Sequence, residues 1–477
     1  MLIHHLERLF LKNIDYNPTK SQKDLIKSFA KFILDHKTNN LFLLKGYAGT
    51  GKTTSVKALI NTLREVRMKS VLLAPTGRAA KVLSSYTNHP AYTIHKKIYR
   101  QKSSRDGMGE FVLDRNLHTN TFFIVDEASM ISNDSGNMSF FGSGRLLDDL
   151  IKYIYEAKNC KLILIGDTAQ LPPVKMNLSP ALDKVQLEGY GLNVYQSFLS
   201  DVLRQTEESG ILFNATEIRR KIDQSVTHFP KIETKDFQDI ELISGADVVE
   251  KISDTYDQHG IESTVIVTRS NKRANQFNQG IRNQILWREE ELTQGDYLMI
   301  VKNNYFWIEE DEEMDFIANG DIAEVVDIKG RDELYGCRYA DVTLRFVDYD
   351  NVEIDVKILL DTLYSNSASL TREENKELFF KVMEDYPEVK TKKQRYLKVR
   401  ENPYFNALQV KFAYAVTCHK AQGGQWKTVF LDHGYLNEEM VDTEFFRWLY
   451  TAFTRPIQKL YLINFYKDFL KEGQIDF

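Results

Sequence analysis

The first 200 residues alternate short apolar runs with stretches in which apolar residues recur at helical spacing. The apolar runs lie at residues 41–44, 71–74, 122–125 and 162–165. After the first run, Val56, Leu59, Ile60 and Leu63 are three or four positions apart, which is typical of a helix with one buried face. Apolar strands separated by helices predict a parallel sheet with helices on both faces.

The same alternation returns after residue 200 and is interrupted by a β-rich stretch. Apolar runs at 264–267, 428–431 and 460–463, with a helical pattern near 272–287, predict a second α/β domain. Between these runs, short strand patterns separated by turn signals predict a small antiparallel barrel; the patterns lie at 297–300, 322–326, 342–346 and 352–356. A charged segment at 366–402 follows and is predicted to be helical.

These patterns divide the chain into two α/β domains, the second of which is split by an insertion. The predicted first domain covers 1–195 and carries a hairpin insertion at about 97–116. The second domain has two parts, 196–291 and 404–477, and the barrel with its charged helical segment occupies 292–403. The predicted fold class is α/β, with two parallel-sheet domains and one small β-barrel.

Composition narrows the class of protein without identifying it. The 477 residues are 43% hydrophobic and 27% charged, and a net charge of −5 argues against a surface coated with nucleic-acid-binding charge, although a basic groove is compatible with it. No run approaches the roughly 18 uninterrupted apolar residues of a membrane span, so no membrane partner is expected. Three widely spaced cysteines, Cys160, Cys337 and Cys418, favour a reducing, cytoplasmic location.

Residues 46–53 read Gly-Tyr-Ala-Gly-Thr-Gly-Lys-Thr and open the helical pattern behind the first apolar run. Glycines let such a loop curl until its N–H groups point at phosphates, and Lys52 and Thr53 would reach phosphate and Mg²⁺. A glycine-rich turn before an ordinary helix is the simpler alternative, but the full motif in a strand–helix context favours ATP binding. The predicted contacts are Gly46, Ala48, Gly49, Thr50, Gly51, Lys52, Thr53 and Thr54.

Polar side chains follow two later strands at the edge where α/β sheets bind ligands. Asp126 and Glu127 come directly after the run 122–125, so Asp126 is predicted to hold Mg²⁺ and Glu127 to deprotonate the attacking water. Gln170 follows the run 162–165 and could bond to a γ-phosphate or to that water. Taken alone, the acidic pair could be a helix N-cap, and the segment around Gln170 a plain turn.

Taken in order, these motifs resemble superfamily 1 DNA helicases, in the superfamily 1B branch of RecD-like and Dda-like enzymes. The resemblance adds Ala-Pro-Thr-Gly-Arg at 74–78, Thr-Ile-His at 93–95, Thr-Cys-His-Lys-Ala-Gln-Gly at 417–423 and Tyr-Thr-Ala-Phe-Thr-Arg at 450–455. It runs from Gln22 to Arg455. It implies two RecA-like motor domains with ATP between them, an SH3-like barrel in the second, and movement 5′ to 3′ along single-stranded DNA.

The resemblance also implies roles for further residues around ATP. Gln22 matches an adenine-contacting glutamine, and Gly423 a nucleotide contact. Arg204 matches an arginine from the second motor domain that touches the γ-phosphate, and Arg455 matches the arginine finger. The implied catalytic set is Lys52, Glu127, Gln170, Arg204 and Arg455. Outside these motifs, a single arginine would more simply form a surface ion pair.

The single-strand groove of the family maps onto residues from both motor domains. The matching positions are Pro75, Thr76, Arg78, Thr93, His95, Thr417, His419 and Lys420. Hydroxyls, imidazoles and cations bind phosphate without reading bases, which suits a motor that must pass any sequence. In isolation, His95 would more simply be a structural histidine. The implied partners are single-stranded DNA and duplex junctions, with repair or replication proteins as further candidates.

Two segments carry less specific signals. Asp106-Gly107-Met108-Gly109 is a turn signal inside 97–116, where relatives carry a strand-splitting pin, and a passive surface hairpin is the alternative. The basic cluster at 390–400 contacts DNA or a partner, or is simply a solvated helix face.

We therefore expect an ATP-driven DNA helicase. A DNA-stimulated ATPase subunit of a larger RecD-like complex is the alternative. A phosphate-loop kinase or nucleotide switch would leave Arg204, Arg455 and His419 unexplained.

Overall fold

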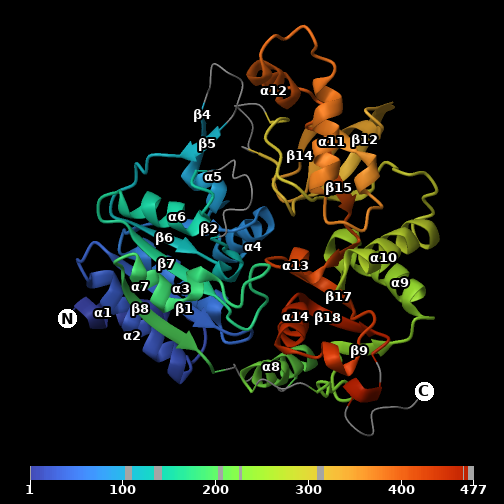
Figure 1. Ribbon diagram of the computed structural model, residues 1–477. Helices are drawn as coiled ribbons and strands as arrows, with labels where there is room; N and C mark the ends of the chain where they lie inside the picture. Colours follow the sequence, from blue (N-terminus) through green and yellow to red (C-terminus); the bar gives the residue numbers. More distant parts are fainter. Residues whose placement is uncertain are drawn as a thin grey trace.

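The computed structural model describes residues 2–102, 110–133, 142–201, 208–224, 228–308, 316–465 and 467–470 (Figure 1). Two sheets of parallel strands and one closed barrel confirm the predicted fold class. Figure 1 shows the first sheet with its blue and green helices on the left, the second sheet at the lower right and the barrel above the second sheet.

The first sheet has six strands in the order β3-β2-β6-β7-β1-β8. Its strands are β1 (Asn40–Gly46), β2 (Lys69–Ala74), β3 (Ala91–Thr93), β6 (Thr121–Val125), β7 (Lys161–Gly166) and β8 (Asn193–Leu199). Strand β1 lies between β7 and β8, with Leu43 opposite Leu164 and Gln196. The predicted domain boundary at 195 falls inside β8, whose seven residues all pair with β1.

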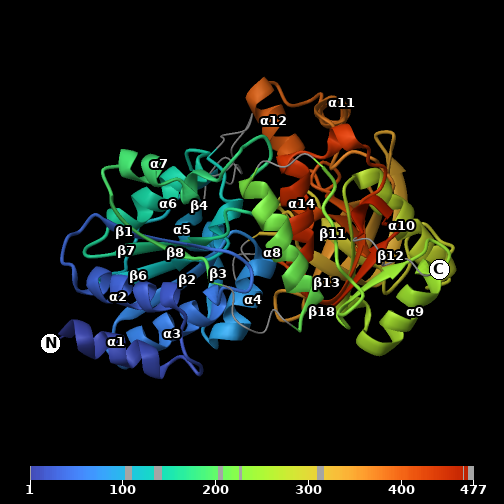
Figure 2. The same ribbon diagram turned by 90° about the horizontal axis from the view of Figure 1, so that it is seen from below.

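Helices cover both faces of this sheet because alternate residues of its strands are apolar on each side. Phe42 and Leu44 face a core shared with α1, α2, α3 and α4, whereas Leu41 and Leu43 face a core shared with α5, α6 and α7. Figure 2 shows α1, α2 and α3 below the sheet and α6 and α7 above it. The helices are α1 (Leu2–Lys12), α2 (Lys20–Leu34), α3 (Lys52–Glu65), α4 (Gly77–Thr87), α5 (Ile94–Ile98), α6 (Leu146–Tyr155) and α7 (Lys184–Gly189).

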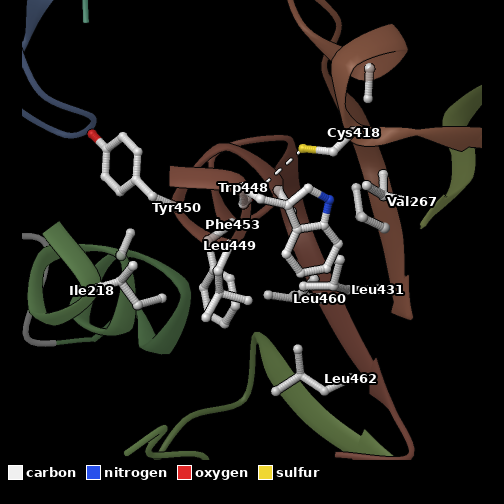
Figure 3. Packing of buried hydrophobic residues seen from close by; sticks show 14 of the residues in the cluster. Ile218, Val267, Cys418, Leu431, Trp448, Leu449, Tyr450, Phe453, Leu460 and Leu462 are labelled. Carbon is white, nitrogen blue, oxygen red and sulfur yellow. Dashed lines mark hydrogen bonds between the residues drawn. The ribbon is translucent and has the colours of Figure 1, made fainter. Parts of the chain in front are cut away.

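The second sheet has five strands in the order β16-β10-β17-β18-β9. They are β9 (Ile240–Ile243), β10 (Thr264–Thr268), β16 (Ala415–Thr417), β17 (Trp426–Asp432) and β18 (Pro456–Ile463). Helices α8 (Gly210–Asp223) and α14 (Thr443–Phe453) share one core with this sheet, and α9 (Val248–His259) and α10 (Asn271–Gln284) share another. Figure 3 shows the apolar side of α14 packed on strands β10, β17 and β18.

The barrel closes in the order β11-β12-β13-β14-β15. Its strands are β11 (Tyr297–Ile300), β12 (Ile322–Leu334), β13 (Cys337–Phe346), β14 (Val352–Leu359) and β15 (Leu408–Phe412). Strand β15 comes from beyond residue 403, where the second motor domain was predicted to resume. It pairs parallel to β14 and antiparallel to β11, and so closes the barrel. Helices α11 (Arg372–Met383) and α12 (Lys392–Arg400) lie between β14 and β15 in the chain.

A two-stranded hairpin projects from the first motor domain. Strand β4 (Tyr99–Lys102) pairs antiparallel with β5 (Glu110–Leu113), and Tyr99 lies opposite Leu113. The turn signal at 106–109 lies outside the described residues. The ring of Phe111 packs 4.7 Å from that of Tyr305 in the insertion. Among the helices that the structure describes, none combines the length and the apolar character needed to cross a bilayer.

Candidate functional site

The phosphate loop joins β1 to α3 through two glycines in the left-handed region. Gly49 has φ +73° and Gly51 has φ +80°, a conformation that costs a side-chain-bearing residue free energy. Gly51 is the N-cap of α3 and has no side chain to bond the first-turn N–H groups, which are therefore available to an anion. A Cβ on Gly49 would also lie 2.7 Å from a Leu212 methyl group, so α8 of the second motor domain packs against this loop.

Gln22 links the start of α2 to the phosphate loop. Its amide nitrogen donates to the Thr50 carbonyl at 3.1 Å and to the Tyr16 hydroxyl at 2.9 Å. Its Oε1 accepts from the backbone N–H of Thr19, the N-cap of α2. The structure therefore gives Gln22 a role in fixing the loop, and the adenine contact implied by the resemblance stays a prediction.

Lys52 lies beside a carboxylate that also contacts the second motor domain. Its Nζ is 3.5 Å from Oδ2 of Asp167, a buried residue just after β7. The Tyr450 hydroxyl on α14 donates to the same Oδ2 at 2.7 Å and accepts from the Ala48 N–H at 2.7 Å. Burial, followed by the neighbouring Asp167 charge, raises the pKa of Tyr450 well above its usual value. The phenol therefore stays protonated and available as a donor.

Asp126 and Glu127 lie at the end of β6, as predicted. The Tyr86 hydroxyl donates to Asp126 Oδ2 at 2.7 Å, and the Glu127 N–H donates to Asp126 Oδ1 at 2.9 Å. Glu127 has φ +52°, a strained backbone for a residue with a side chain. Burial raises the pKa of Glu127, and the nearby Arg455 opposes that shift. A carboxylate with a raised pKa is suited to accept a proton near neutral pH.

The residues predicted to hold Mg²⁺ fit that ion. The described residues contain no group of three or more metal-binding side chains. Mg²⁺ often binds nucleotides with one or two protein oxygens, the remaining positions being filled by phosphate and water. Asp126 is half-buried at the end of β6, and Thr53 lies in the first turn of α3, so each carries an oxygen of the kind that Mg²⁺ binds, and the Mg²⁺ site itself stays a prediction.

Gln170 and Leu171 connect the two motor domains. Gln170 is 5% exposed, and its Oε1 has no hydrogen-bond partner among the described residues, so this acceptor is free for a water or ligand. The Leu171 N–H donates to Oγ1 of Thr451 at 2.8 Å, and the Gln422 amide donates to the Leu171 carbonyl at 2.7 Å. Both backbone groups of Leu171 are therefore bonded to the second motor domain.

Of the two predicted arginines, the structure places one. Arg455 follows α14 and is 3% exposed; its guanidinium donates to the Thr451 carbonyl, the Gly424 carbonyl and the Thr454 hydroxyl. Its charge acts on Glu127 from across the junction between the motor domains. Arg204 lies outside the described residues.

Four of the predicted DNA contacts line one cleft between the motor domains and the barrel. The cleft measures about 180 Å³, and its walls include Thr76, Arg78, His419 and Lys420. Burial lowers the pKa of Lys420 to about 8 and lowers that of His419. Such desolvated groups gain from an anionic ligand that restores their charged forms.

Three predicted threonines lie at helix N-termini: Thr93 and Thr417 end strands β3 and β16, and Thr76 follows β2. Thr76 caps α4, Thr93 caps α5 and Thr417 precedes the short helix α13 (Cys418–Ala421), so N–H groups accompany each hydroxyl. Pro75 leads into the Thr76 cap. His95 lies apart from the cleft-lining residues: its ring is 6.1 Å from that of Phe316, and burial lowers its pKa to about 4.

Gly423 lies beside Thr76 and the first turn of α4. A Cβ at this position would lie 2.9 Å from the Ala79 Cβ and 3.3 Å from Thr76 Oγ1. The structure therefore groups Gly423 with the residues of α4, and its nucleotide contact stays a prediction.

Several side chains at the site were not singled out from the sequence. Tyr450 and Asp167 lie inside recognised motifs, but nothing in the pattern distinguishes them from core or turn residues. Tyr86 lies on an ordinary amphipathic helix. Trp426 lines the same cleft as Thr76 and Arg78, but as an aromatic at the start of an apolar strand it is expected in a core.

Two family models match the chain. Residues 18–224 match a model described as an AAA domain, and residues 412–463 match one described as a UvrD-like helicase C-terminal domain. The chain is 30% identical to the ATP-dependent RecD2 DNA helicase of Deinococcus radiodurans over 34% of this chain and 20% of that protein. It is 25% identical to the ATP-dependent DNA helicase dda of Enterobacteria phage T4 over 59% of this chain and 60% of that protein.

Solved structures with a similar overall arrangement include a Pif1 helicase from Bacteroides in complex with ADP-AlF3 and single-stranded DNA. The identity is 16%, the TM-score is 0.46, and the match covers 96% of this chain and 95% of that chain. The chain spans less than two thirds of the length of the RecD2 and dda proteins.

Proposed function

Because the chain belongs to the superfamily 1B helicases of the RecD and Dda type, we propose that it is an ATP-dependent DNA helicase that moves 5′ to 3′ on single-stranded DNA and unwinds duplex DNA. One observation carries the proposal. Groups from both motor domains converge on the phosphate loop and on the Gln170-Leu171 segment, while the same two domains form the walls of the basic cleft. Bound nucleotide and bound DNA would therefore both contact the junction between the two motor domains.

At the ATP site, the chain's residues bind phosphate and accept a proton. Lys52 and the N–H groups of the loop other than that of Ala48, which donates to Tyr450, hold the β- and γ-phosphates, and Glu127 takes the proton of the attacking water. Gln170 orients that water through its free Oε1. Mg²⁺, held by Thr53 and Asp126, would neutralise phosphate charge. Arg455 and Arg204 are proposed to stabilise the charge of the transition state from the second domain.

At the DNA cleft, the contacts are to backbone phosphate. Thr76 and Arg78 come from the first motor domain, and Thr417, His419 and Lys420 from the second. Because a strand bound across the cleft touches both domains, it favours the arrangement in which Arg455 faces Glu127. ATP turnover is thereby coupled to movement along the strand.

The deciding experiment compares two partial duplexes that differ only in the polarity of their single-stranded tail. We expect the purified chain to unwind the 5′-tailed duplex with ATP and to leave the 3′-tailed one intact. Unwinding from the 3′ tail would contradict the polarity. ATPase activity stimulated by single-stranded DNA without unwinding of either substrate would instead favour an ATPase subunit of a larger RecD-like complex. Repair or replication proteins are then the proposed partners.

We also infer a cytoplasmic location. The three cysteines are free, and Cys160 and Cys418 are buried, which is typical of thiols that stay reduced. The test unfolds the full-length chain and labels it with a thiol reagent, with and without prior treatment with a reductant. If the protein comes from a reducing compartment, all three thiols react without the reductant.

A further inference from the structure

The hydroxyl of Tyr450 lies at the junction of the two motor domains. It accepts from the N–H of Ala48 in the phosphate loop and donates to Asp167, which follows β7. Figure 3 shows the oxygen directed away from the apolar cluster toward the blue ribbon of the first domain. One phenol on α14 therefore contacts two separate segments of the ATP site.

The rest of Tyr450 is firmly anchored in the second domain. The residue is 1% exposed, and its ring belongs to the core that includes Ile218, Leu449 and Phe453. A displacement of the hydroxyl must therefore move α14 or be resisted by it, because close-packed cores deform little.

Asp167 is shared between Tyr450 and Lys52. The Tyr450 hydroxyl lies 2.7 Å from Asp167 Oδ2, and the Lys52 Nζ lies 3.5 Å from the same oxygen. When ATP draws the Lys52 ammonium toward its phosphates, Asp167 loses that cation and depends more strongly on the Tyr450 hydroxyl, because a hydrogen bond to an uncompensated carboxylate is stronger. The bond to Tyr450 should therefore tighten when nucleotide binds.

Arg455 is hydrogen-bonded to the turn of the chain that carries Tyr450. Its Nε donates to the carbonyl of Thr451, the residue after Tyr450, at 3.0 Å. The Thr451 hydroxyl accepts from Leu171, beside Gln170. Tyr450, Thr451 and Arg455 therefore lie in one hydrogen-bonded turn that contacts both the phosphate loop and the Gln170-Leu171 segment.

We propose that Tyr450 is a positioning residue that transmits occupation of the phosphate loop, through Lys52 and Asp167, to the placement of Arg455. The inference rests on the proposed function, since it assigns Tyr450 to coupling within that ATPase cycle. Tyr450 itself does not touch the reacting atoms. Loss of its hydroxyl should therefore lower kcat, because Arg455 is less often correctly placed, and should leave nucleotide affinity unchanged.

The test removes the hydroxyl and keeps the ring. Tyr450→Phe is compared with Tyr256→Phe, a control at another buried tyrosine of the second domain whose hydroxyl has no hydrogen-bond partner among the described residues. For each protein, kcat and KM for ATP are measured with and without saturating single-stranded DNA, together with the midpoint of thermal unfolding. The parent and Asp167→Asn, alone and combined with Tyr450→Phe, complete a double-mutant cycle.

We expect Tyr450→Phe to lower the DNA-stimulated kcat at least about tenfold, with KM changed less than about threefold, since a misplaced group costs rate more than binding. Tyr256→Phe should match the parent, and the double variant should be no slower than the slower single one. Three results would each contradict the proposed role of Tyr450: an unchanged kcat, a rise in KM alone, or losses of the two single variants that multiply fully in the double variant. If the parent shows no DNA-stimulated turnover, the proposed function is wrong, and the role of Tyr450 that rests on it is wrong as well.

Discussion

The guanidinium carbon of Arg78 lies 4.2 Å from the centroid of the Trp426 indole. Arg78 comes from α4 of the first motor domain and Trp426 begins β17 of the second, so this cation–π contact crosses the cleft that both residues line. Stacking on an aromatic ring fixes the orientation of a planar guanidinium, and the group always carries its positive charge. Trp426 therefore orients the cation that is proposed to meet the DNA backbone.

Arg78→Lys keeps the charge and loses the stacked plane. We expect it to weaken binding of single-stranded DNA by about 0.5–2 kcal/mol, which is roughly two- to thirtyfold. Fluorescence anisotropy with a labelled oligonucleotide measures the change. Arg64→Lys, at an exposed position of α3, is the matched control. Equal affinity for the parent and Arg78→Lys would show that the stacking does not orient a DNA contact.

Glu127→Gln should retain binding of ATP and DNA but lose turnover by about 10²–10⁴-fold, because an amide does not accept the proton of the attacking water. Since burial raises the pKa of Glu127, kcat of the parent should fall on acidification at a higher pH than an ordinary glutamate would give. A pH profile of kcat checks the sign, and Glu65→Gln on the exposed end of α3 is the control. Substantial hydrolysis by Glu127→Gln would mean that another group is the base.

Much of the first domain could be predicted from the sequence because its signals are local. The apolar runs at 41–44, 71–74, 122–125 and 162–165 all lie within strands of the first sheet, and the phosphate loop joins β1 to α3 as expected. Local periodicity says less about pairing between distant segments. Residues 404–412 were predicted to belong to the second motor domain because nothing in their local sequence indicates that residues 410–412 pair with residues 298–300.

The site was predictable where a motif names a residue type, and not where contacts decide the role. Asp126, Glu127 and Gln170 were predicted because polar groups follow apolar strands, and the structure places them after β6 and β7. Tyr450 was not, since a tyrosine between Leu449 and Thr451 on a largely apolar helix is expected in a core. Its role depends on which loop faces its hydroxyl, and that is set by the docking of the two domains.

Arg455→Ala should lower the DNA-stimulated ATPase rate by about 10³-fold or more and leave DNA affinity nearly intact, by analogy with other arginine fingers. Steady-state ATPase assays and anisotropy measure the two quantities. Because Arg455 is buried and hydrogen-bonded, Arg455→Lys and a thermal unfolding curve separate lost catalysis from lost folding. Arg372→Ala at the exposed start of α11 is the control. A rate that does not depend on DNA in the parent would remove the basis of the motor function.

Asp321 should make the stability of the barrel depend on pH. Burial raises its pKa to about 8, and the charge of Asp348 adds to the shift, although the Ala318 N–H and the Tyr349 hydroxyl both donate to it. An acid with a raised pKa stabilises the fold below its unfolded pKa of about 3.9, and this contribution is lost as the pH rises through about 8. The free energy of unfolding should therefore fall across that range.

Asp321→Asn should flatten this dependence, because the amide oxygen still accepts a hydrogen bond and carries no charge. Thermal unfolding across the same pH range measures the slope, and Asp350→Asn, at an exposed turn position, is the control. An Asp321→Asn protein whose unfolding midpoint keeps the slope of the parent would show that other groups carry the pH dependence.

We expect the hairpin of β4 and β5 to separate the strands of duplex DNA. Strands β4 and β5 are paired, and Phe111 packs on Tyr305 and Phe316 of the insertion, so the base of the hairpin is held between the first motor domain and the insertion. Such a rigid support suits a wedge that stacks on the terminal base pair, an interaction worth about 1–3 kcal/mol per base. Replacing residues 102–112 entirely would also remove Phe111 from the core.

The sharper variant replaces only residues 103–109 with a short Gly-Ser link, so that β4, β5 and Phe111 remain. We expect it to keep DNA-stimulated ATPase and translocation and to lose unwinding of a 5′-tailed duplex, because the strand can still be pulled while nothing blocks its re-pairing. Stopped-flow translocation on single-stranded DNA and a strand-displacement assay measure the two activities separately. If the shortened protein separates strands as fast as the parent, the wedge lies elsewhere on the molecule and the hairpin is a passive surface feature.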